Sequence, residues 1–241
     1  MIVSETRAKP PQPTTDLRSY GRRRGRRLSA RQAHLIRAVL PGVSIDLSTP
    51  APRDARELFT CPVNDVWLEI GFGGGEHLVW QAQNNPDVGC IGCEVFEDGV
   101  VKLVTAIEDR ALRNVLVCVE DARLLLRWLP PASISRVFVL FPDPWPKKKH
   151  AKRRLLSRDT LGLLARVMKP GGELRIATDI DDYLRTILVA FRGHPQFSWQ
   201  VKGAGDWRVR GADWPGTRYE EKALREGRRR YFLRFLRTEA A

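Results

Sequence analysis

The amino-acid sequence predicts an α/β domain built on a doubly wound, mostly parallel sheet of seven strands. After about residue 63, short apolar segments alternate with amphipathic helical patterns, which is typical of parallel sheets covered by helices on both faces. Glycine, proline and acidic residues gather just after the apolar segments, where open α/β sheets bind their ligands. The 241 residues, 43% of them hydrophobic, suffice for one well-covered core.

The first 28 residues differ in composition from the rest of the chain. They are rich in Pro, Thr and Arg and poor in apolar side chains, so residues 1–28 are expected to form a flexible basic arm and residues 29–241 a single domain. A helix is expected to begin after Ser29, which is a good N-cap. Its apolar stripe comprises Ala33, Ile36, Val39 and Leu40. Pro41-Gly42 is expected to end it.

Strands and helices then follow in turn. Strands are expected at residues 66–70, 88–94, 115–119, 136–141 and 172–178, with two later ones around residues 197–201 and 231–236. Three helices present apolar stripes: Val100, Val104, Ile107 and Ala111; Leu161, Leu164, Ala165 and Met168; and Tyr183, Ile187, Leu188 and Phe191. The second of these helices is expected to end at Pro170-Gly171-Gly172.

The charge balance indicates a polyanionic partner. Lys and Arg number 41 against 28 Asp and Glu, a net charge of +13, which favours nucleic acid or an anionic membrane surface. A membrane is disfavoured, because no run of about 18 apolar residues exists and the basic segments are not paired with an apolar helix face. The N-terminus lacks a secretory apolar core, so a cytoplasmic location is expected.

The four cysteines are expected to be buried thiols. Cys90 and Cys93 have CxxC spacing, but they lie inside an apolar segment and no second pair accompanies them. Cys61 and Cys118 are isolated. The sequence therefore predicts no metal site.

A glycine loop follows the first strand. It reads Gly71-Phe-Gly-Gly-Gly75, and Gly71 and Gly73 are expected to let the backbone approach a ligand closely. A dinucleotide fingerprint needs a third glycine at position 76 or 78, where Glu76 and Leu78 stand instead. A negative side chain at a helix start suits a pyrophosphate badly, so a ligand without phosphates, such as S-adenosylmethionine, fits better.

Three carboxylates follow three successive strands. Glu69 ends the first strand, Glu94 ends the second at the distance expected for a ribose contact, and Asp121 follows the third, where an acceptor meets an adenine amino group. Together with the glycine loop, this set resembles the class I S-adenosylmethionine-dependent methyltransferases, whose fold is Rossmann-like. The resemblance implies S-adenosylmethionine as co-substrate and no metal.

A proline-rich acidic turn ends the fourth strand and leads into a basic run. The turn is Phe141-Pro-Asp-Pro-Trp-Pro146, which prolines hold stiff, and Asp143 supplies its acceptor. The basic side chains that follow are Lys147, Lys148, Lys149, Lys152, Arg153 and Arg154. A rigid acidic turn beside a basic run can hold a base while the basic side chains bind phosphates.

At this turn the sequence is similar to the bacterial tRNA (guanine-N7)-methyltransferases. The similarity runs from about Arg18 to the end, and its most specific pieces are residues 141–148 and Thr217-Arg-Tyr-Glu220. It implies methyl transfer to N7 of a guanine in the tRNA variable loop, with tRNA as partner and no obligate protein partner. Ala151 departs from the usual polar residue and puts one RNA contact in doubt.

The resemblance also implies roles for individual residues. The implied cofactor contacts are Glu69, Glu94, Asp121 and Asp143, beside Gly71 and Gly73 of the loop. Asp143 is implied as the catalytic carboxylate, and its division of work with Asp179 stays open. The implied substrate contacts are Lys147, Asp179, Thr217, Arg218, Tyr219 and Glu220, with Tyr219 free to stack on a base. Lys148, Lys149, Lys152, Arg153 and Arg154 are expected on the RNA backbone.

Two other functions remain open from the residues alone. An amino-group methyltransferase acting on adenine or cytosine has a similar acidic turn with prolines and an aromatic residue, and the methylated base would separate it. A non-enzymatic RNA-binding protein on the same fold would fail to bind S-adenosylmethionine. A small-molecule methyltransferase leaves the basic segments without a role.

Overall fold

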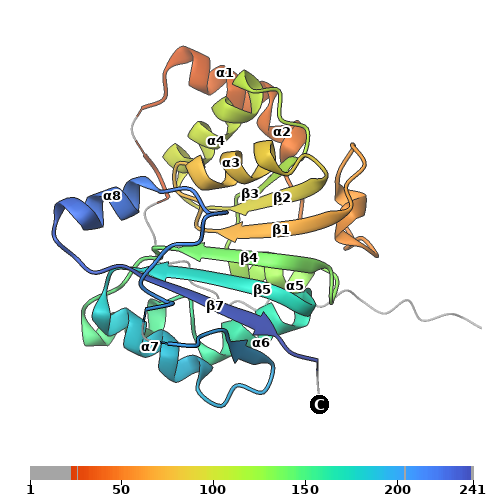
Figure 1. Cartoon of the computed structure of the whole chain (residues 1–241). Coiled ribbons are helices and arrows are strands. Elements are labelled where there is room, and N and C mark those ends of the chain that lie inside the picture. The colour runs from red at the N-terminus through yellow and green to blue at the C-terminus, as the bar shows by residue number, and fades with distance from the viewer. Residues whose placement is uncertain (1–22, 26, 204, 240–241) are drawn as a thin grey trace, which may run out of the picture.

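A computed structural model describes residues 23–25, 27–203 and 205–239 of the chain. Its seven strands form one sheet in the order β3-β2-β1-β4-β5-β7-β6, as Figure 1 shows. The strands are β1 (Asp65–Ile70), β2 (Val88–Cys93), β3 (Val115–Cys118), β4 (Ile134–Leu140), β5 (Met168–Thr178), β6 (Phe197–Trp199) and β7 (Tyr231–Arg237). β1 to β5 pair in parallel, and β7 runs antiparallel to β5 and β6. The predicted mostly parallel, seven-stranded sheet is confirmed.

The strand order fixes where a ligand belongs. From β1 the chain winds outward through β2 and β3, then returns to place β4 on the other side of β1. The carboxyl ends of β1 and β4 are therefore the switch point of the sheet, where the flanking loops diverge and leave a crevice. In Figure 1 these ends point toward α8 (Arg218–Arg225).

Helices cover both faces of the sheet. One face carries α5 (Ala122–Trp128), α6 (Arg158–Val167) and α7 (Asp181–Phe191). The other carries α3 (Glu76–Asn84) and α4 (Glu97–Asp109), on which α1 (Ala30–Ala38) and α2 (Leu40–Val43) rest. Short 3-10 turns are η1 (Ala55–Leu58) and η2 (Lys148–Arg153). No helix in the described part of the chain has the length and apolar character needed to cross a bilayer.

On the second face, a loop takes the place of a helix over β4, β5 and β7. Trp214 of this loop is 4% exposed and packs edge-on against Phe138 of β4 and Phe232 of β7, with ring centroids 6.5 Å and 5.4 Å away. Burial of an aromatic side chain of this size stabilises a fold by roughly 2–3 kcal/mol. The C-terminal part of the chain is thus fixed to the sheet before it reaches α8.

The first helix forms as predicted, but its end differs. Ser29 caps α1 in a capping box with Gln32, and Leu35 is its most buried side chain. Pro41 and Gly42 lie inside the short helix α2 and do not terminate helical structure, because proline at the first turn of a helix gives up a donor that would be unbonded anyway. Residues 1–22 and 26 of the expected basic arm lie outside the described residues.

Two other boundaries correct the sequence prediction. α6 ends at Val167, and Met168 begins β5, where it pairs with Ile134. The register then shifts, so that Pro170, Gly171 and Gly172 form an irregularity inside the strand and do not close the helix. Similarly, Ala111 lies beyond the end of α4, in the left-handed region at φ 50°.

Candidate active site

A cavity of about 780 Å³ opens at the carboxyl edge of the sheet. Its walls are the loops that follow β1, β2, β3 and β4, together with the start of α6 and one side chain of α8. Of the residues predicted for the site, those that line it are Gly71, Gly73, Glu94, Asp121, Asp143, Lys152, Arg153, Arg154 and Tyr219. The position is the one that the strand order demands.

Glu94 ties the glycine loop to the end of β2. Its carboxylate accepts hydrogen bonds from the backbone N–H groups of Gly73 (3.0 Å), Val95 (2.9 Å) and Phe96 (3.0 Å). Gly71 and Gly73 have φ of 74° and 56°, a conformation that glycine adopts without strain. Burial raises the pKa of Glu94, and the nearby charge of Asp143 adds to the rise, although the three backbone bonds oppose it.

Gly99 is a part of the site that sequence analysis missed. It lies in the first turn of α4, and a Cβ placed there would stand 2.3 Å from the carbonyl oxygen of Gly73. Only glycine lets α4 approach the loop so closely. A glycine within an otherwise regular helical pattern was the signal, because it disfavours helix by roughly 1 kcal/mol relative to alanine.

A Gly99→Ala variant is therefore expected to push the glycine loop out of place and to raise the Kd for S-adenosylmethionine about tenfold or more, because strain of this kind costs roughly 1–3 kcal/mol. Calorimetric titration measures the affinity. Gly162→Ala is the matched control, since nothing lies within 4 Å of its Cβ position on α6. Equal affinity of Gly99→Ala and Gly162→Ala for S-adenosylmethionine would contradict this expectation and show that the glycine loop tolerates displacement.

Asp121 begins α5 as its N-cap. Its carboxylate accepts from the backbone N–H of Arg123 (2.9 Å) and from the guanidinium of the same residue at Nε and Nη2, each at 2.8 Å. Burial pushes the pKa of Asp121 upward, but the bonds from Arg123 outweigh it and the pKa is lowered. After β3, the cavity is thus lined by the charged carboxylate of Asp121, and Arg123 fixes the orientation of that carboxylate.

The acidic turn after β4 is held in an unusual backbone conformation. Phe141 and Trp145 have φ of 50° and 42°, in the left-handed region that bulky residues rarely occupy. Such conformations persist where the surrounding structure enforces them and gather at functional sites. Between them, Asp143 lines the cavity, and its carboxylate has no hydrogen-bond partner among the described residues. Partial burial alone raises its pKa.

Arg154 departs from its predicted role on the RNA backbone. Its side chain is 5% exposed; Nε donates to the carbonyl of Pro144 (2.8 Å), and the other nitrogens donate to Thr186 and Asp182 of α7. The guanidinium also stacks over the ring of Tyr183. The enclosed guanidinium of Arg154 supports the acidic turn through its bond to Pro144 and has little exposed surface with which to bind a phosphate. Lys148, Lys149, Lys152 and Arg153 lie in η2, and of these Lys152 and Arg153 line the cavity.

Glu69 also differs from the expectation. It is 2% exposed, and its carboxylate is 2.7 Å from Nδ1 of His77, which itself lies 3.1 Å from Gln81. It is not among the residues that line the cavity. The alternation of β1 explains this placement, because Ile70 faces the α5 side and Glu69 faces α3.

The predicted C-terminal contacts divide into two groups. Tyr219 reaches the cavity, where a Cβ on Gly73 would lie 3.1 Å from its ring, and Arg218 lies 3.7 Å from Glu76. Thr217 is the buried N-cap of α8 and accepts from the backbone N–H of Glu220.

The remaining predicted contacts lie outside the cavity. Glu220 is 6% exposed and pairs with Arg210 (3.1 Å) and Arg230 (3.0 Å). Asp179 pairs with Arg228 at 2.6 Å, and Lys147 is the residue before η2. The structure therefore brings the residues predicted to bind the cofactor together around the cavity, with the exception of Glu69. Glu220, Asp179 and Lys147 do not line the cavity.

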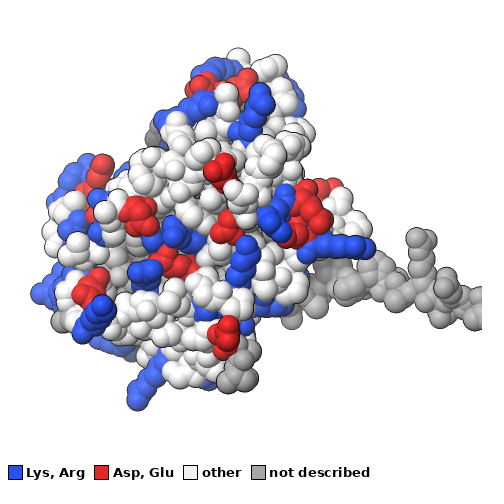
Figure 2. Space-filling model, turned by 45° about the vertical axis from the view of Figure 1, so that its right-hand side comes forward, with Lys and Arg blue, Asp and Glu red and all other residues white. Residues whose placement is uncertain are grey.

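The donors and acceptors of the cavity suit S-adenosylmethionine. Glu94 offers carboxylate oxygens for ribose hydroxyls, the glycine loop offers open backbone, and Asp143 places a negative charge at the rim. Figure 2 shows Lys and Arg side chains with Asp and Glu between them on the face that it presents. Among the described residues, no group of three or more His, Cys, Asp or Glu side chains is placed to hold a metal ion. Cys90, Cys93 and Cys118 are buried thiols as expected, whereas Cys61 is only partly buried, which corrects the expectation for that residue.

Comparison with known proteins identifies the family. A family model described as “Putative methyltransferase” matches residues 63–233. The tRNA (guanine-N(7)-)-methyltransferase of Chelativorans sp. (strain BNC1) is 48% identical over 91% of this chain and 94% of its own length. The enzyme of that name from Rhodospirillum rubrum is 46% identical over 96% and 92%, respectively.

Solved structures agree on the fold. The 16S rRNA methyltransferase KamB superposes with a TM-score of 0.52 at 19% identity, covering 73% of this chain and 89% of KamB. The antibiotic-resistance methyltransferase Kmr superposes with a TM-score of 0.51 at 20% identity, covering 75% and 90%. By the extent and identity of the sequence matches, this chain belongs to the tRNA (guanine-N(7)-)-methyltransferase family.

Proposed function

We propose that this protein transfers a methyl group from S-adenosylmethionine to N7 of a guanine in the variable loop of tRNA. One observation carries the proposal: in a chain of this family, the cavity that suits S-adenosylmethionine opens onto the unpartnered carboxylate of Asp143. The comparisons do not favour an amino-group methyltransferase or a non-enzymatic RNA-binding protein. As tRNA is its substrate, we place the protein in the cytoplasm.

The methyl transfer requires alignment of the two substrates and a stabilising negative charge more than it requires a general base. S-adenosylmethionine supplies an electrophilic methyl group on a sulfonium. Guanine N7 carries an in-plane lone pair and no proton, so no base is needed to create the nucleophile. The methylated purine is cationic, and the fixed negative charge of Asp143 stabilises it as it forms. The stiff turn that carries Asp143 holds that charge in place.

Asp143 also provides selectivity. Its carboxylate accepts from the N1–H and the amino group of guanine, whereas adenine presents no N1–H to it. Mispairing a buried acceptor is costly, which is how such a site discriminates between bases. Asp179, which the ion pair with Arg228 holds at the end of β5, contributes negative charge at the outer side of the target base.

Other residues divide between the two substrates. Glu94 binds the ribose hydroxyls of S-adenosylmethionine, and Asp121 lies where the adenine of the same molecule binds. Tyr219 stacks on the target base from the far wall, since it lies against the glycine loop. Glu69 acts indirectly, because its buried bond to His77 braces the start of α3. The side chains proposed to bind RNA phosphates are Lys147, Lys148, Lys149, Lys152 and Arg153.

A matched pair of tRNAs tests the proposal. One carries guanosine at the variable-loop target and the other carries 7-deazaguanosine, which keeps every amino group but lacks N7. Methyl transfer from labelled S-adenosylmethionine is expected to the first only. Transfer to the second would assign the reaction to an atom other than N7 and overturn the proposal.

A further inference from the structure

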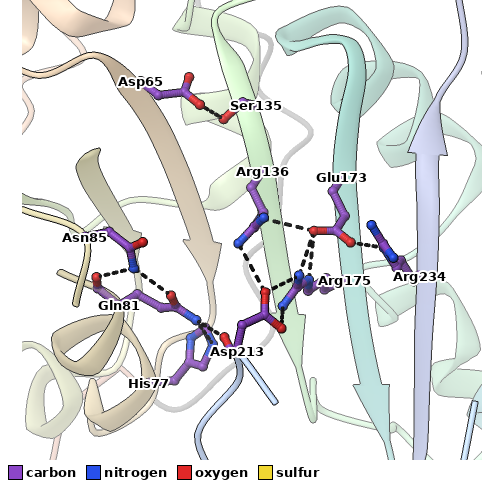
Figure 3. Close-up of polar contacts among 10 residues, drawn as sticks. All are labelled: Asp65, His77, Gln81, Asn85, Ser135, Arg136, Glu173, Arg175, Asp213 and Arg234. Atoms are coloured by element: carbon purple, nitrogen blue, oxygen red, sulfur yellow. Dashed lines mark hydrogen bonds and ion pairs between the residues drawn. The ribbon is translucent and has the colours of Figure 1, made fainter. Parts of the chain in front are cut away.

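A cluster of charged side chains lies on the sheet face that the C-terminal loop covers (Figure 3). Glu173 and Arg175 of β5 are 5% and 6% exposed, and they alternate with the buried apolar residues Leu174 and Ile176. Glu173 accepts from Arg175 Nε at 2.9 Å, and Arg136 Nε lies 3.0 Å from it. Arg234 of β7 also pairs with Glu173. Three guanidinium groups thus surround one carboxylate.

Asp213 supplies the second carboxylate of this cluster. It lies in the loop before α8 and accepts from both terminal nitrogens of Arg175, at 3.0 Å and 2.7 Å, in a bidentate pair. Arg136 Nη1 lies 3.7 Å away. The hydrogen bonds from Arg175 lower the pKa of Asp213, although burial opposes them. Arg175 is buried and shares its compensating charge between Asp213 and Glu173, so Glu173 still pairs with it when Asp213 is changed.

The backbone of Asp213 is held as well. Its carbonyl accepts a hydrogen bond from Gln81 of α3 at 3.1 Å, and Gln81 in turn contacts His77, the partner of Glu69 (Figure 3). One residue of the loop is therefore attached to β5 by its side chain and to α3 by its main chain. These two contacts determine where the chain leaves the sheet.

The segment that leaves the sheet after Asp213 leads to residues 217–220, which were predicted to contact the substrate. Trp214 is buried in the adjoining aromatic cluster, and its carbonyl accepts from Arg210. Arg210 also pairs with Glu220 of α8. Thr217 then caps α8, whose Tyr219 lines the same cavity as Asp143. A shift of Asp213 would therefore move Tyr219 relative to the acidic turn.

We infer that Asp213 is a positioning residue for the RNA substrate, which fixes residues 217–220 against the cavity through its bonds to Arg175 and Gln81. It touches neither substrate nor cofactor. The inference rests on the proposed function, because the segment it positions is the one proposed to contact the target nucleotide. The hydrogen bonds that shape the cofactor side of the cavity, from the backbone of Gly73, Val95 and Phe96 to Glu94, do not involve Asp213.

Asp213→Asn tests the inference, because it keeps the shape and removes the charge. The side chain is 58% exposed, so the variant is not expected to unfold. We expect kcat/KM for tRNA to fall roughly 10- to 100-fold, as is typical when one partner of a hydrogen-bonded ion pair is lost. The Kd for S-adenosylmethionine stays unchanged. Hydrogen exchange at the backbone amides of α8 accelerates while exchange in β1 and β4 does not.

Two further variants make the test specific. Asp213→Glu keeps the carboxylate and is expected to recover part of the lost kcat/KM. Asp206→Asn changes an aspartate of the same loop whose carboxylate, among the described residues, accepts from the backbone of Lys202 and Gly203, at 2.6 Å and 3.0 Å, and the variant is expected to behave as the wild type.

Either of two results overturns the inference. Asn at 213 with wild-type kcat/KM and wild-type exchange in α8 would show that the anchor does not position the segment. Equal losses in tRNA turnover, cofactor affinity and melting temperature would show a general structural role instead. If the wild-type protein transfers no methyl group to any tRNA, the proposed function itself fails, which the variants alone do not produce.

Discussion

Replacing Asp143 by alanine is expected to lower kcat for methyl transfer roughly 10²- to 10³-fold, the usual cost of removing one preorganised electrostatic contact to a transition state. The carboxylate lines the cavity and has no hydrogen-bond partner in the part of the chain that the structure describes, so its charge is available to the substrate. Affinity for S-adenosylmethionine is expected to survive, because Glu94 and the glycine loop are held by bonds that do not involve Asp143.

Asp143→Asn separates charge from shape and is expected to be nearly as inactive as the alanine variant. Asp87→Asn, at the opposite edge of the sheet before β2, is the control for loss of one carboxylate. Wild-type turnover in Asp143→Asn would remove Asp143 from the mechanism.

The same residue determines the pH dependence. Since burial raises the pKa of Asp143, its carboxylate takes up a proton at a higher pH than an exposed aspartate does. At saturating S-adenosylmethionine, kcat should therefore fall as the pH is lowered, with an apparent pKa above 3.8, the value of an unperturbed aspartate. The residual activity of Asp143→Asn should lack this acid limb.

Replacing Glu94 by alanine is expected to have the second largest effect, on cofactor binding. The change removes the acceptor for the ribose and releases three backbone N–H groups, including that of Gly73 in the loop. Each hydrogen bond to a charged group contributes roughly 1.5–3 kcal/mol, so the Kd for S-adenosylmethionine should rise at least 10- to 100-fold.

Calorimetric titration of the Glu94→Ala variant checks this expectation, with Glu108→Gln on the exposed end of α4 as the control. Since excess S-adenosylmethionine restores occupancy, kcat should recover far more than in Asp143→Ala. An unchanged Kd in Glu94→Ala would show that the ribose is bound elsewhere.

The sequence carried enough information to predict the sheet and its ligand-binding edge. Strands such as residues 66–70 are mainly apolar, which is a local signal that tertiary contacts reinforce, and the observed strand is Asp65–Ile70. Glu94 and Asp143 were found for the same reason, since each follows a buried strand directly. Their position along the chain, at the ends of two predicted strands, was sufficient to place both residues at the cavity.

Residues whose role depends on side-chain direction or burial were harder to predict. Arg154 looked like its basic neighbours, and only the packing of α7 against the turn distinguishes it, through Asp182 and Thr186. Glu69 stood beside the loop in the sequence, but the alternation of β1 turns it toward His77. The partners of Arg154 lie 28 and 32 residues away along the chain, whereas His77 is only 8 residues from Glu69 and is brought to it by the direction of the side chain.

The charged cluster illustrates the same limit. Arg175 and Asp213 are 38 residues apart, and no periodic pattern relates them. The signal that the sequence did contain was a pair of charges, Glu173 and Arg175, alternating with the apolar residues Leu174 and Ile176. Charges in such a place need partners, so the pair indicated a polar contact on that face without identifying Asp213.

The most direct test of the account is the identity of the methylated nucleoside. The purified protein would be incubated with labelled S-adenosylmethionine and bulk tRNA that lacks modifications, and the RNA digested to nucleosides. The account predicts that the label appears in 7-methylguanosine. Label in a different nucleoside, such as an adenosine or cytidine methylated on its amino group, would contradict it.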